Sequence, residues 1–102
     1  MEEKSMNLRE ALQHYADNRK KWLKHVRYYF GTASYNQGTD KEYYSRKVLE
    51  VTTWGVRLLD FLASHLDELP TDEKSKLVLQ RDFDELKAID KVARAYLADP
   101  WF

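Results

Sequence analysis

Apolar side chains recur every three or four residues along three stretches of the chain, which is the spacing of one face of an α-helix. No stretch shows the strict alternation of apolar and polar residues that is typical of a β-strand. The sequence therefore predicts an all-α protein. The expected helices cover about residues 8–30, 40–68 and 72–98.

Residues at the ends of these stretches have the properties of helix caps. Asn7 and Glu10 have the spacing of a capping box, in which the Asn side chain accepts a hydrogen bond from the third amide and the Glu side chain reaches back. A second capping box is predicted at residues 39–42, and Thr71 is the predicted N-cap of the third helix. Gly31 follows the first stretch and suits a left-handed C-terminal cap. These signals set the predicted boundaries.

The connections between the predicted helices are short, which favours antiparallel packing of neighbours. We expect an up-down-up three-helix bundle in which the second helix contacts both others. A helix of about 25 residues is roughly 38 Å long, so the bundle should be elongated, and it should form a single helical domain over residues 1–102. Matching heights along the helices places Trp22 near Gly55, where the missing side chain leaves room for an indole. Residues 99–102 can fold back to close the open end of the bundle.

Three charged residues interrupt the apolar faces of the predicted helices. Arg19 lies in the apolar face of the first helix, and Asp82 and Asp90 lie inside the edges of that of the third. Because an unpaired charge in an apolar environment is costly, opposite charges there are expected to pair. We expect a cross-helix ion pair between Arg19 and Asp82, which lies level with it, or otherwise between Arg19 and Asp90. Such a pair specifies the register of the bundle; the alternative interpretation is a polar core that a partner opens.

Basic residues gather on the water-facing side of the first predicted helix. Arg9, Lys20, Lys24 and Arg27 lie within about 60° of one another around this helix, and Tyr28 lies at the edge of the stripe. The stripe can lie along phosphates while Tyr28 stacks on a base, or it can face the acidic surface of a protein partner. A third interpretation is that these cations complement the helix dipole and keep an aromatic-rich chain soluble.

The second predicted helix is apolar over more than half of its circumference. Its second apolar row contains Leu49, Val56 and Leu59, which either pack against two neighbouring helices or form a surface for self-association. The tyrosine-rich stretch over residues 28–43 adds aromatic side chains to this surface. The candidate partner-binding residues are therefore Arg9, Lys20, Lys24, Arg27, Tyr28, Tyr35, Leu49, Val56 and Leu59.

The sequence lacks the residues that most site chemistries need. It has no cysteine, which excludes disulfides, thiolate zinc sites and cysteine nucleophiles. His14 and His25 are expected to face water, and His65 is expected to form a structural hydrogen bond. The acidic residues of the third helix have basic residues three or four positions away and are interpreted as a solvated, salt-bridged face. No phosphate-binding loop or catalytic motif is present, so we expect no enzyme, no cofactor and no metal site.

Lysine and arginine together number 17, as do aspartate and glutamate, so the net charge indicates no class of partner. The chain contains neither the apolar run of a signal peptide nor an apolar stretch long enough to span a bilayer, and we expect a cytoplasmic protein that does not bind membranes. The predicted function is that of a small non-enzymatic helical protein that binds another protein or its own copy, as an adaptor, an inhibitor or a small subunit of an assembly. The alternative is a nucleic-acid-associated helical protein that uses the basic stripe.

Overall fold

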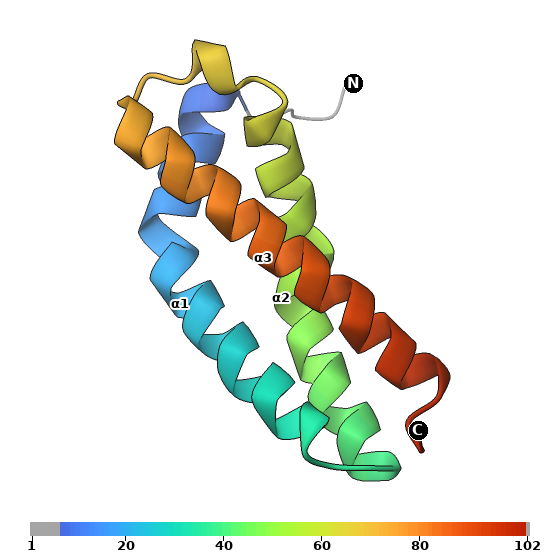
Figure 1. Ribbon diagram of the computed structural model, residues 1–102. Coiled ribbons are helices and arrows are strands. Elements are labelled where there is room, and N and C mark those ends of the chain that lie inside the picture. Colours follow the sequence, from blue (N-terminus) through green and yellow to red (C-terminus); the bar gives the residue numbers. More distant parts are fainter. Residues whose placement is uncertain (1–6, 102) are drawn as a thin grey trace, which may run out of the picture.

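The structure is a computed structural model that describes residues 7–101. It contains three long helices that run up, down and up (Figure 1). They are α1 (Leu8–Ser34), α2 (Thr39–Ala63) and α3 (Glu73–Ala98), and a short 3-10 helix, η1 (Leu66–Glu68), lies between α2 and α3. No strand occurs among the described residues. The predicted all-α, up-down-up three-helix bundle is confirmed.

The central helix of the bundle is α2. It packs along its length against both α1 and α3, whereas α1 and α3 approach each other much less closely. Val48, Leu59 and Leu62 of α2 have almost no exposed surface, and the same is true of Val26 in α1 and Leu86 in α3. The buried side chains of the three helices form one hydrophobic core cluster, in which α2 is the shared neighbour.

The bundle is elongated and flat. Its extents along the principal axes are 44, 38 and 19 Å, and the radius of gyration of its Cα atoms is 15.1 Å. A compact domain of 100 residues has a radius of gyration of about 13 Å. The larger value follows from the length of the helices and from the loose approach of α1 to α3.

The predicted start of the first helix is confirmed, but its predicted end is wrong. Glu10 N–H donates to Asn7 Oδ1 at 2.8 Å and Asn7 N–H donates to Glu10 Oε1 at 3.3 Å, so the capping box at the start of α1 is confirmed. The cap predicted at Gly31 is wrong, because α1 continues through Gly31 to Ser34. The added turn buries Ala33 completely, and this packing outweighs the low helix propensity of glycine.

The boundaries of α2 and α3 also differ from the prediction. Gly38, with a φ of 65°, precedes α2 and no side chain caps this end, so the capping box predicted at residues 39–42 is not formed. α2 ends at Ala63, and η1 covers most of the remaining segment that was predicted to be helical. The N-cap of α3 is Asp72 and not Thr71, because the Asp72 carboxylate accepts the hydrogen bond of the third helical amide at 2.8 Å.

The segment after α3 folds back on the connection between α1 and α2. Gly38 N–H donates to the Pro100 carbonyl oxygen at 2.9 Å. The Trp101 ring lies so close that a Cβ atom at Gly38 would be 2.6 Å from Trp101 Cη2. The predicted closure of this end is therefore present as far as Trp101, and Phe102 lies outside the described residues. Both the positive φ and the close approach require glycine at this position.

The space beside Gly55 is filled by α3 and not by α1. Leu86 Cδ1 lies 3.7 Å from the position that a Cβ atom of Gly55 would take, and Trp22 does not come within 4 Å of that position. Trp22 packs edge-on against Trp54 of α2 with ring centroids 4.7 Å apart. The predicted contact between Trp22 and Gly55 is wrong, because Gly55 is on the side of α2 that faces α3.

Candidate functional site

A polar cluster of Arg19, Asp82 and Tyr15 joins α1 to α3. The Asp82 side chain is 2% exposed. Arg19 Nε donates to Asp82 Oδ2 at 2.6 Å, and Arg19 Nη2 donates to Oδ1 at 3.1 Å. Tyr15 Oη donates to Asp82 Oδ2 at 2.5 Å. The cross-helix pair predicted from the sequence is formed, and Tyr15, one turn before Arg19, completes it.

The surroundings of this cluster fix its protonation. Burial, reinforced by the hydrogen bond to Asp82, raises the pKa of the Tyr15 phenol well above its ordinary value. The hydrogen bond to Asp82 raises the pKa of the Arg19 guanidinium. A general acid or base needs a pKa near the working pH. Tyr15 and Arg19 therefore keep their protons at neutral pH and both donate hydrogen bonds from α1 to Asp82 of α3.

Asp90 is not part of this cluster. It accepts a hydrogen bond from Thr52 Oγ1 at 2.7 Å and another from Arg94 Nε at 2.9 Å. Asp90 lies about 12 Å beyond Asp82 along α3, which is too far for contact with Arg19. The alternative pairing of Arg19 with Asp90 is therefore wrong.

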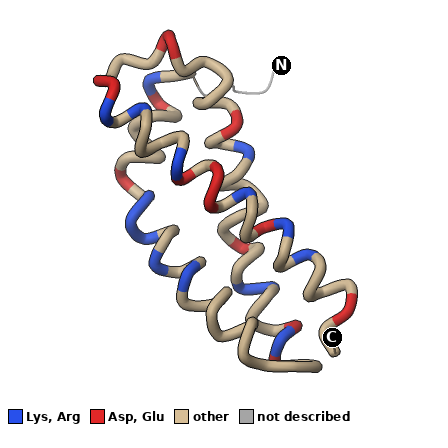
Figure 2. Tube along the Cα trace, in the orientation of Figure 1, with Lys and Arg blue, Asp and Glu red and all other residues tan. Residues whose placement is uncertain are grey.

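A groove between α1 and α3 gathers much of the basic stripe. It encloses about 510 Å³, and its lining residues are Arg19, Lys20, Leu23, Lys24, Arg27 and Arg81. Figure 2 shows the run of basic residues along α1. Lys20, Lys24 and Arg81 form no ion pair with any residue that the structure describes. The sequence reasoning missed Arg81, although its position next to Asp82 places it at the height of Arg19.

The other two cations of the predicted stripe have different surroundings. Arg27 donates from Nε and Nη2 to the Glu85 carboxylate at 2.7 and 2.8 Å. This contact raises the pKa of Arg27 and lowers the pKa of Glu85. Arg9 is exposed but lies about 16 Å from Lys20 along α1 and lines a separate cavity. The stripe is therefore shorter and less charged than the sequence indicated.

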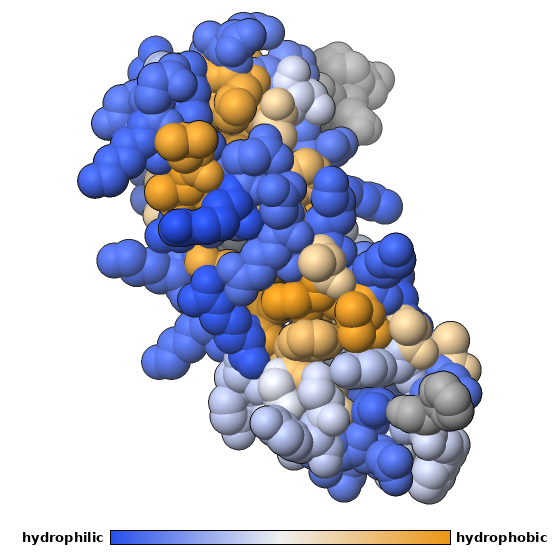
Figure 3. All heavy atoms as spheres, in the orientation of Figure 1, coloured by the Kyte–Doolittle hydropathy of each residue, from blue (hydrophilic) through white to orange (hydrophobic). Residues whose placement is uncertain are grey.

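Four tyrosines, which we call the tyrosine ladder, form a continuous row of rings across α1 and α2. The ladder consists of Tyr28, Tyr29, Tyr44 and Tyr43, whose successive ring centroids are 5.0, 6.0 and 5.1 Å apart. Its outer members are exposed, Tyr28 at 64% and Tyr43 at 54%, and Tyr35 at the end of α1 is 92% exposed. Figure 3 shows side chains of intermediate hydropathy gathered at this end of the molecule. These rings meet because of how α1 is rotated about its own axis relative to α2. The spacing of apolar residues along the sequence does not indicate this rotation.

The second apolar row of α2 is not an exposed patch. Leu59 is completely buried, and Leu49 and Val56 are half-buried against the core. Thr52, in the same row, donates a hydrogen bond to Asp90 of α3. Leu59 is therefore excluded as a partner-binding residue, because it is buried in the core. Leu49 and Val56 are partly covered in the same way and keep only part of their surface exposed.

The histidines serve mainly structural roles. His14 is exposed, as predicted. His25 is half-buried, and its Nε2–H donates to the Lys47 carbonyl oxygen at 2.7 Å, so the prediction that it faces water is wrong. The cause is that this side of α1 faces α2. His65 Nδ1–H donates to the Phe61 carbonyl oxygen at 2.9 Å, which confirms its predicted structural bond. No group of three His, Asp or Glu residues in the described part could hold a metal ion.

Comparisons of the chain with protein-family models, with curated proteins and with solved structures found no match in any of the three. Within residues 7–101, no helix combines the length and the apolar character that crossing a membrane requires.

Proposed function

We propose that this protein is a non-enzymatic helical protein that binds another protein through the tyrosine ladder and the lysines beside it. The observation that carries the proposal is the gathering of exposed Tyr28, Tyr35 and Tyr43 at one end of the molecule. Tyrosine offers a large and rigid contact area, and it is enriched among the residues that dominate binding at interfaces. Lys20 and Lys24 extend this surface along α1.

The charges beside the tyrosines favour an acidic partner. Lys24 lies one turn before Tyr28, and neither Lys24 nor Lys20 has an ion-pair partner in the described part of the chain. At physiological salt, exposed charges act over about 8 Å, so these lysines orient a partner only at close approach. A protein surface with carboxylates around an apolar centre complements this arrangement.

Nucleic-acid binding is the second candidate function. It is favoured by the groove in which Lys20, Lys24 and Arg81 converge, and by the exposed Tyr28 ring close by, which can stack on a base. So few phosphate contacts, on a chain with no net charge, support non-specific affinity only at or beyond the weak end of the usual range, a Kd of about 10⁻⁴ M at physiological salt. Protein binding therefore remains the preferred function.

The experiment compares the proteins captured from the native cell by the wild-type chain and by a Tyr28→Ala/Tyr43→Ala variant. A Leu77→Ala variant is the matched control, because Leu77 is 72% exposed on α3. Each captured protein is purified and titrated against all three chains. We expect the tyrosine variant to bind at least tenfold more weakly and the control to bind as the wild type does.

Short single-stranded and double-stranded nucleic acids are titrated in parallel at about 0.15 M salt. Sub-micromolar binding that a Lys20→Glu/Lys24→Glu variant abolishes, with no protein partner sensitive to the tyrosine variant, would replace protein binding with the second candidate. Sedimentation of the chain alone identifies the partner as a second copy if a dimer forms and the tyrosine variant disrupts it.

A further inference from the structure

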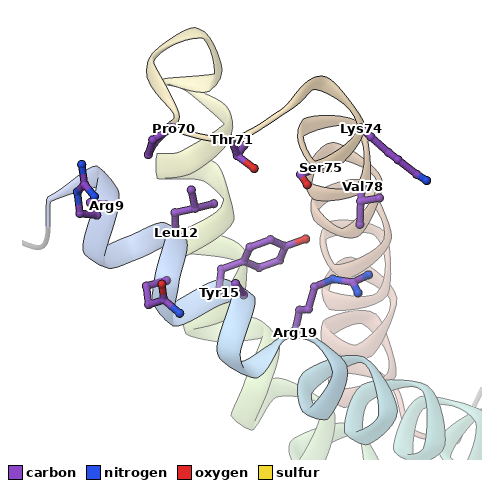
Figure 4. Close-up of a pocket in the computed structure, with 11 residues that line it drawn as sticks. Arg9, Leu12, Tyr15, Arg19, Pro70, Thr71, Lys74, Ser75 and Val78 are labelled. Carbon is purple, nitrogen blue, oxygen red and sulfur yellow. The ribbon is translucent and has the colours of Figure 1, made fainter.

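A separate cavity lies at the opposite end of the bundle from the tyrosine ladder. It encloses about 510 Å³ between the N-terminal half of α1, the connection at Pro70 and Thr71, and the N-terminal half of α3 (Figure 4). Pockets that hold small molecules have volumes of about 300–1,000 Å³. Arg9 in this cavity and Tyr28 in the ladder are about 28 Å apart along α1, so the two surfaces are independent.

The walls of this cavity are largely apolar. Leu12 of α1 and Val78 of α3 contribute aliphatic side chains, and the Tyr15 ring lies between the two helices (Figure 4). The Tyr15 hydroxyl is engaged by Asp82 at 2.5 Å, so Tyr15 offers its ring to a ligand and not its hydroxyl. These walls suit the body of an apolar molecule.

The charged residues that line the cavity are all basic. Arg9 and Lys74 stand at opposite rims, are exposed, and form no ion pair with a described residue (Figure 4). The charge of Arg19 is balanced by Asp82. The nearby Asp72 carboxylate lies outside the lining and is occupied in capping α3. The rims therefore favour an anion over a neutral or cationic group.

We propose that this cavity binds a small amphiphile with an apolar body and one anionic head, of which a medium-chain carboxylate is the simplest case. The body lies against Leu12, Val78 and the Tyr15 ring. The head lies at one of the two rims, beside either Arg9 or Lys74, where water can still solvate it. This site does not depend on the proposed protein binding, because neither the ladder tyrosines nor Lys20 and Lys24 line the cavity.

The first test keeps the apolar body constant and changes the head. The chain is titrated calorimetrically with decanoate, decanol and decyltrimethylammonium, each below the concentration at which it aggregates. We expect saturable binding of decanoate at least fivefold tighter than that of decanol, and the weakest binding for the cation. Equal affinity for decanoate and decanol, or no saturable binding of decanoate, would overturn the proposal.

The second test locates the site with an Arg9→Gln/Lys74→Gln variant. Both residues are exposed, so their loss leaves the core unchanged. The matched control is Lys21→Gln/Lys91→Gln, which removes two exposed lysines that do not line the cavity. We expect the cavity variant to bind decanoate no more tightly than decanol, and the control to keep the wild-type preference. An equal loss in the control would show a general charge effect and would reject the site.

Discussion

Two arginine-carboxylate pairs connect α1 to α3, and they differ in burial. The side chains of Arg19 and Asp82 are 24% and 2% exposed, whereas those of Arg27 and Glu85 are 59% and 28% exposed. In each pair the arginine Nε and Nη2 atoms donate to the two carboxylate oxygens, so the geometry is nearly the same. The pairs differ in burial and in the hydrogen bond that Tyr15 donates to Asp82. Water solvates Glu85 after its arginine is removed but does not reach Asp82.

We expect Arg19→Ala to lower the free energy of unfolding by about 2–3 kcal/mol, because it leaves a buried carboxylate without its countercharge. Arg27→Ala should lower it by less than about 1 kcal/mol, as is usual for an exposed pair. Urea unfolding of both variants at neutral pH measures the two losses.

A double variant, Arg19→Ala/Asp82→Ala, separates the buried charge from the rest of the packing. Its loss should be smaller than the sum of the two single losses, because the second substitution removes the carboxylate that the first leaves unpaired. Equal losses for Arg19→Ala and Arg27→Ala, or strict additivity in the double variant, would show that Asp82 carries no burial penalty.

Tyr15 makes the free energy of unfolding fall as the pH rises into the alkaline range. Burial and the hydrogen bond to Asp82 raise its pKa in the folded chain, whereas the phenol of the unfolded chain ionises near pH 10. The stabilisation is fully present below about pH 10 and is lost above it, because the unfolded state releases the proton first. Tyr15→Phe should therefore lower stability by about 1.5 kcal/mol at neutral pH and make its alkaline decline shallower.

The measurement is the free energy of unfolding at intervals from neutral pH to about pH 11, above the ordinary tyrosine pKa. Tyr28→Phe is the control, because Tyr28 is 64% exposed and contacts no carboxylate in the described part of the chain. A decline that Tyr15→Phe does not change, or that Tyr28→Phe changes equally, would mean that ionisation of Tyr15 is not linked to folding.

At the scale of the elements, Gly31 and Gly38 have opposite roles although both lie near the connection between α1 and α2. Gly31 is inside α1, and a Cβ atom there would meet nothing within 4 Å. Gly38 has a φ of 65° and contacts Trp101. We expect Gly31→Ala to stabilise the chain by about 0.5–1 kcal/mol through helix propensity. Gly38→Ala should destabilise it by about 1–2 kcal/mol, because alanine is strained in the left-handed region.

Thermal unfolding of the two variants tests whether the first is more stable and the second less stable than the wild type. A destabilised Gly31→Ala variant would indicate that α1 ends at Gly31, as the sequence alone predicted. A neutral Gly38→Ala variant would indicate that the left-handed turn and the contact with Trp101 do not contribute to stability.

The ends of the helices show which structural features a short sequence pattern can predict. The Asn7 cap was predictable because the residues that form it lie within one turn of each other. The extension past Gly31 was not, because it accompanies the burial of Ala33, which depends on the folded structure around it. The hydrogen bond of Gly38, the N-cap residue of α2, to the distant Pro100 carbonyl oxygen was not predictable either, because no local sequence signal reports it.

The contacts between helices also divide into those that the sequence indicates and those that depend on how the helices pack. The contact between Arg19 and Asp82 was predictable, because two opposite charges in apolar rows at one height have few other ways to be satisfied. The ring contact between Tyr29 and Tyr44 was not predictable, because it requires the rotation of α1 about its axis relative to α2. The helical period fixes the face that is apolar but not the neighbour that each part of that face meets.

At the scale of the whole molecule, α2 is the packing partner that α1 and α3 share. The loose approach of α1 to α3 leaves each of them dependent on α2 for burial of its apolar face. The burial of Leu59 illustrates the consequence, since a row that resembled a docking surface is used inside the chain. We therefore expect the bundle to unfold in one cooperative step.

Two optical probes test this expectation from different parts of the bundle. In a Trp101→Phe background the remaining indoles, Trp22 and Trp54, lie against each other between α1 and α2, with ring centroids 4.7 Å apart. Their fluorescence reports that contact, whereas circular dichroism reports all three helices. The urea transitions of the two signals should coincide.

Leu86→Ala perturbs the bundle from the opposite side, because Leu86 of α3 packs over Gly55 of α2 and is 1% exposed. It should lower the free energy of unfolding by about 2–4 kcal/mol. Leu86 lies on α3, whereas Trp22 and Trp54 lie on α1 and α2, so a change in the fluorescence transition shows that the loss at α3 extends to the other two helices. We expect both transitions to shift equally, and neither to shift in a Leu77→Ala control. A dichroism transition that moves while the fluorescence transition stays in place would show that α3 unfolds as a separate unit.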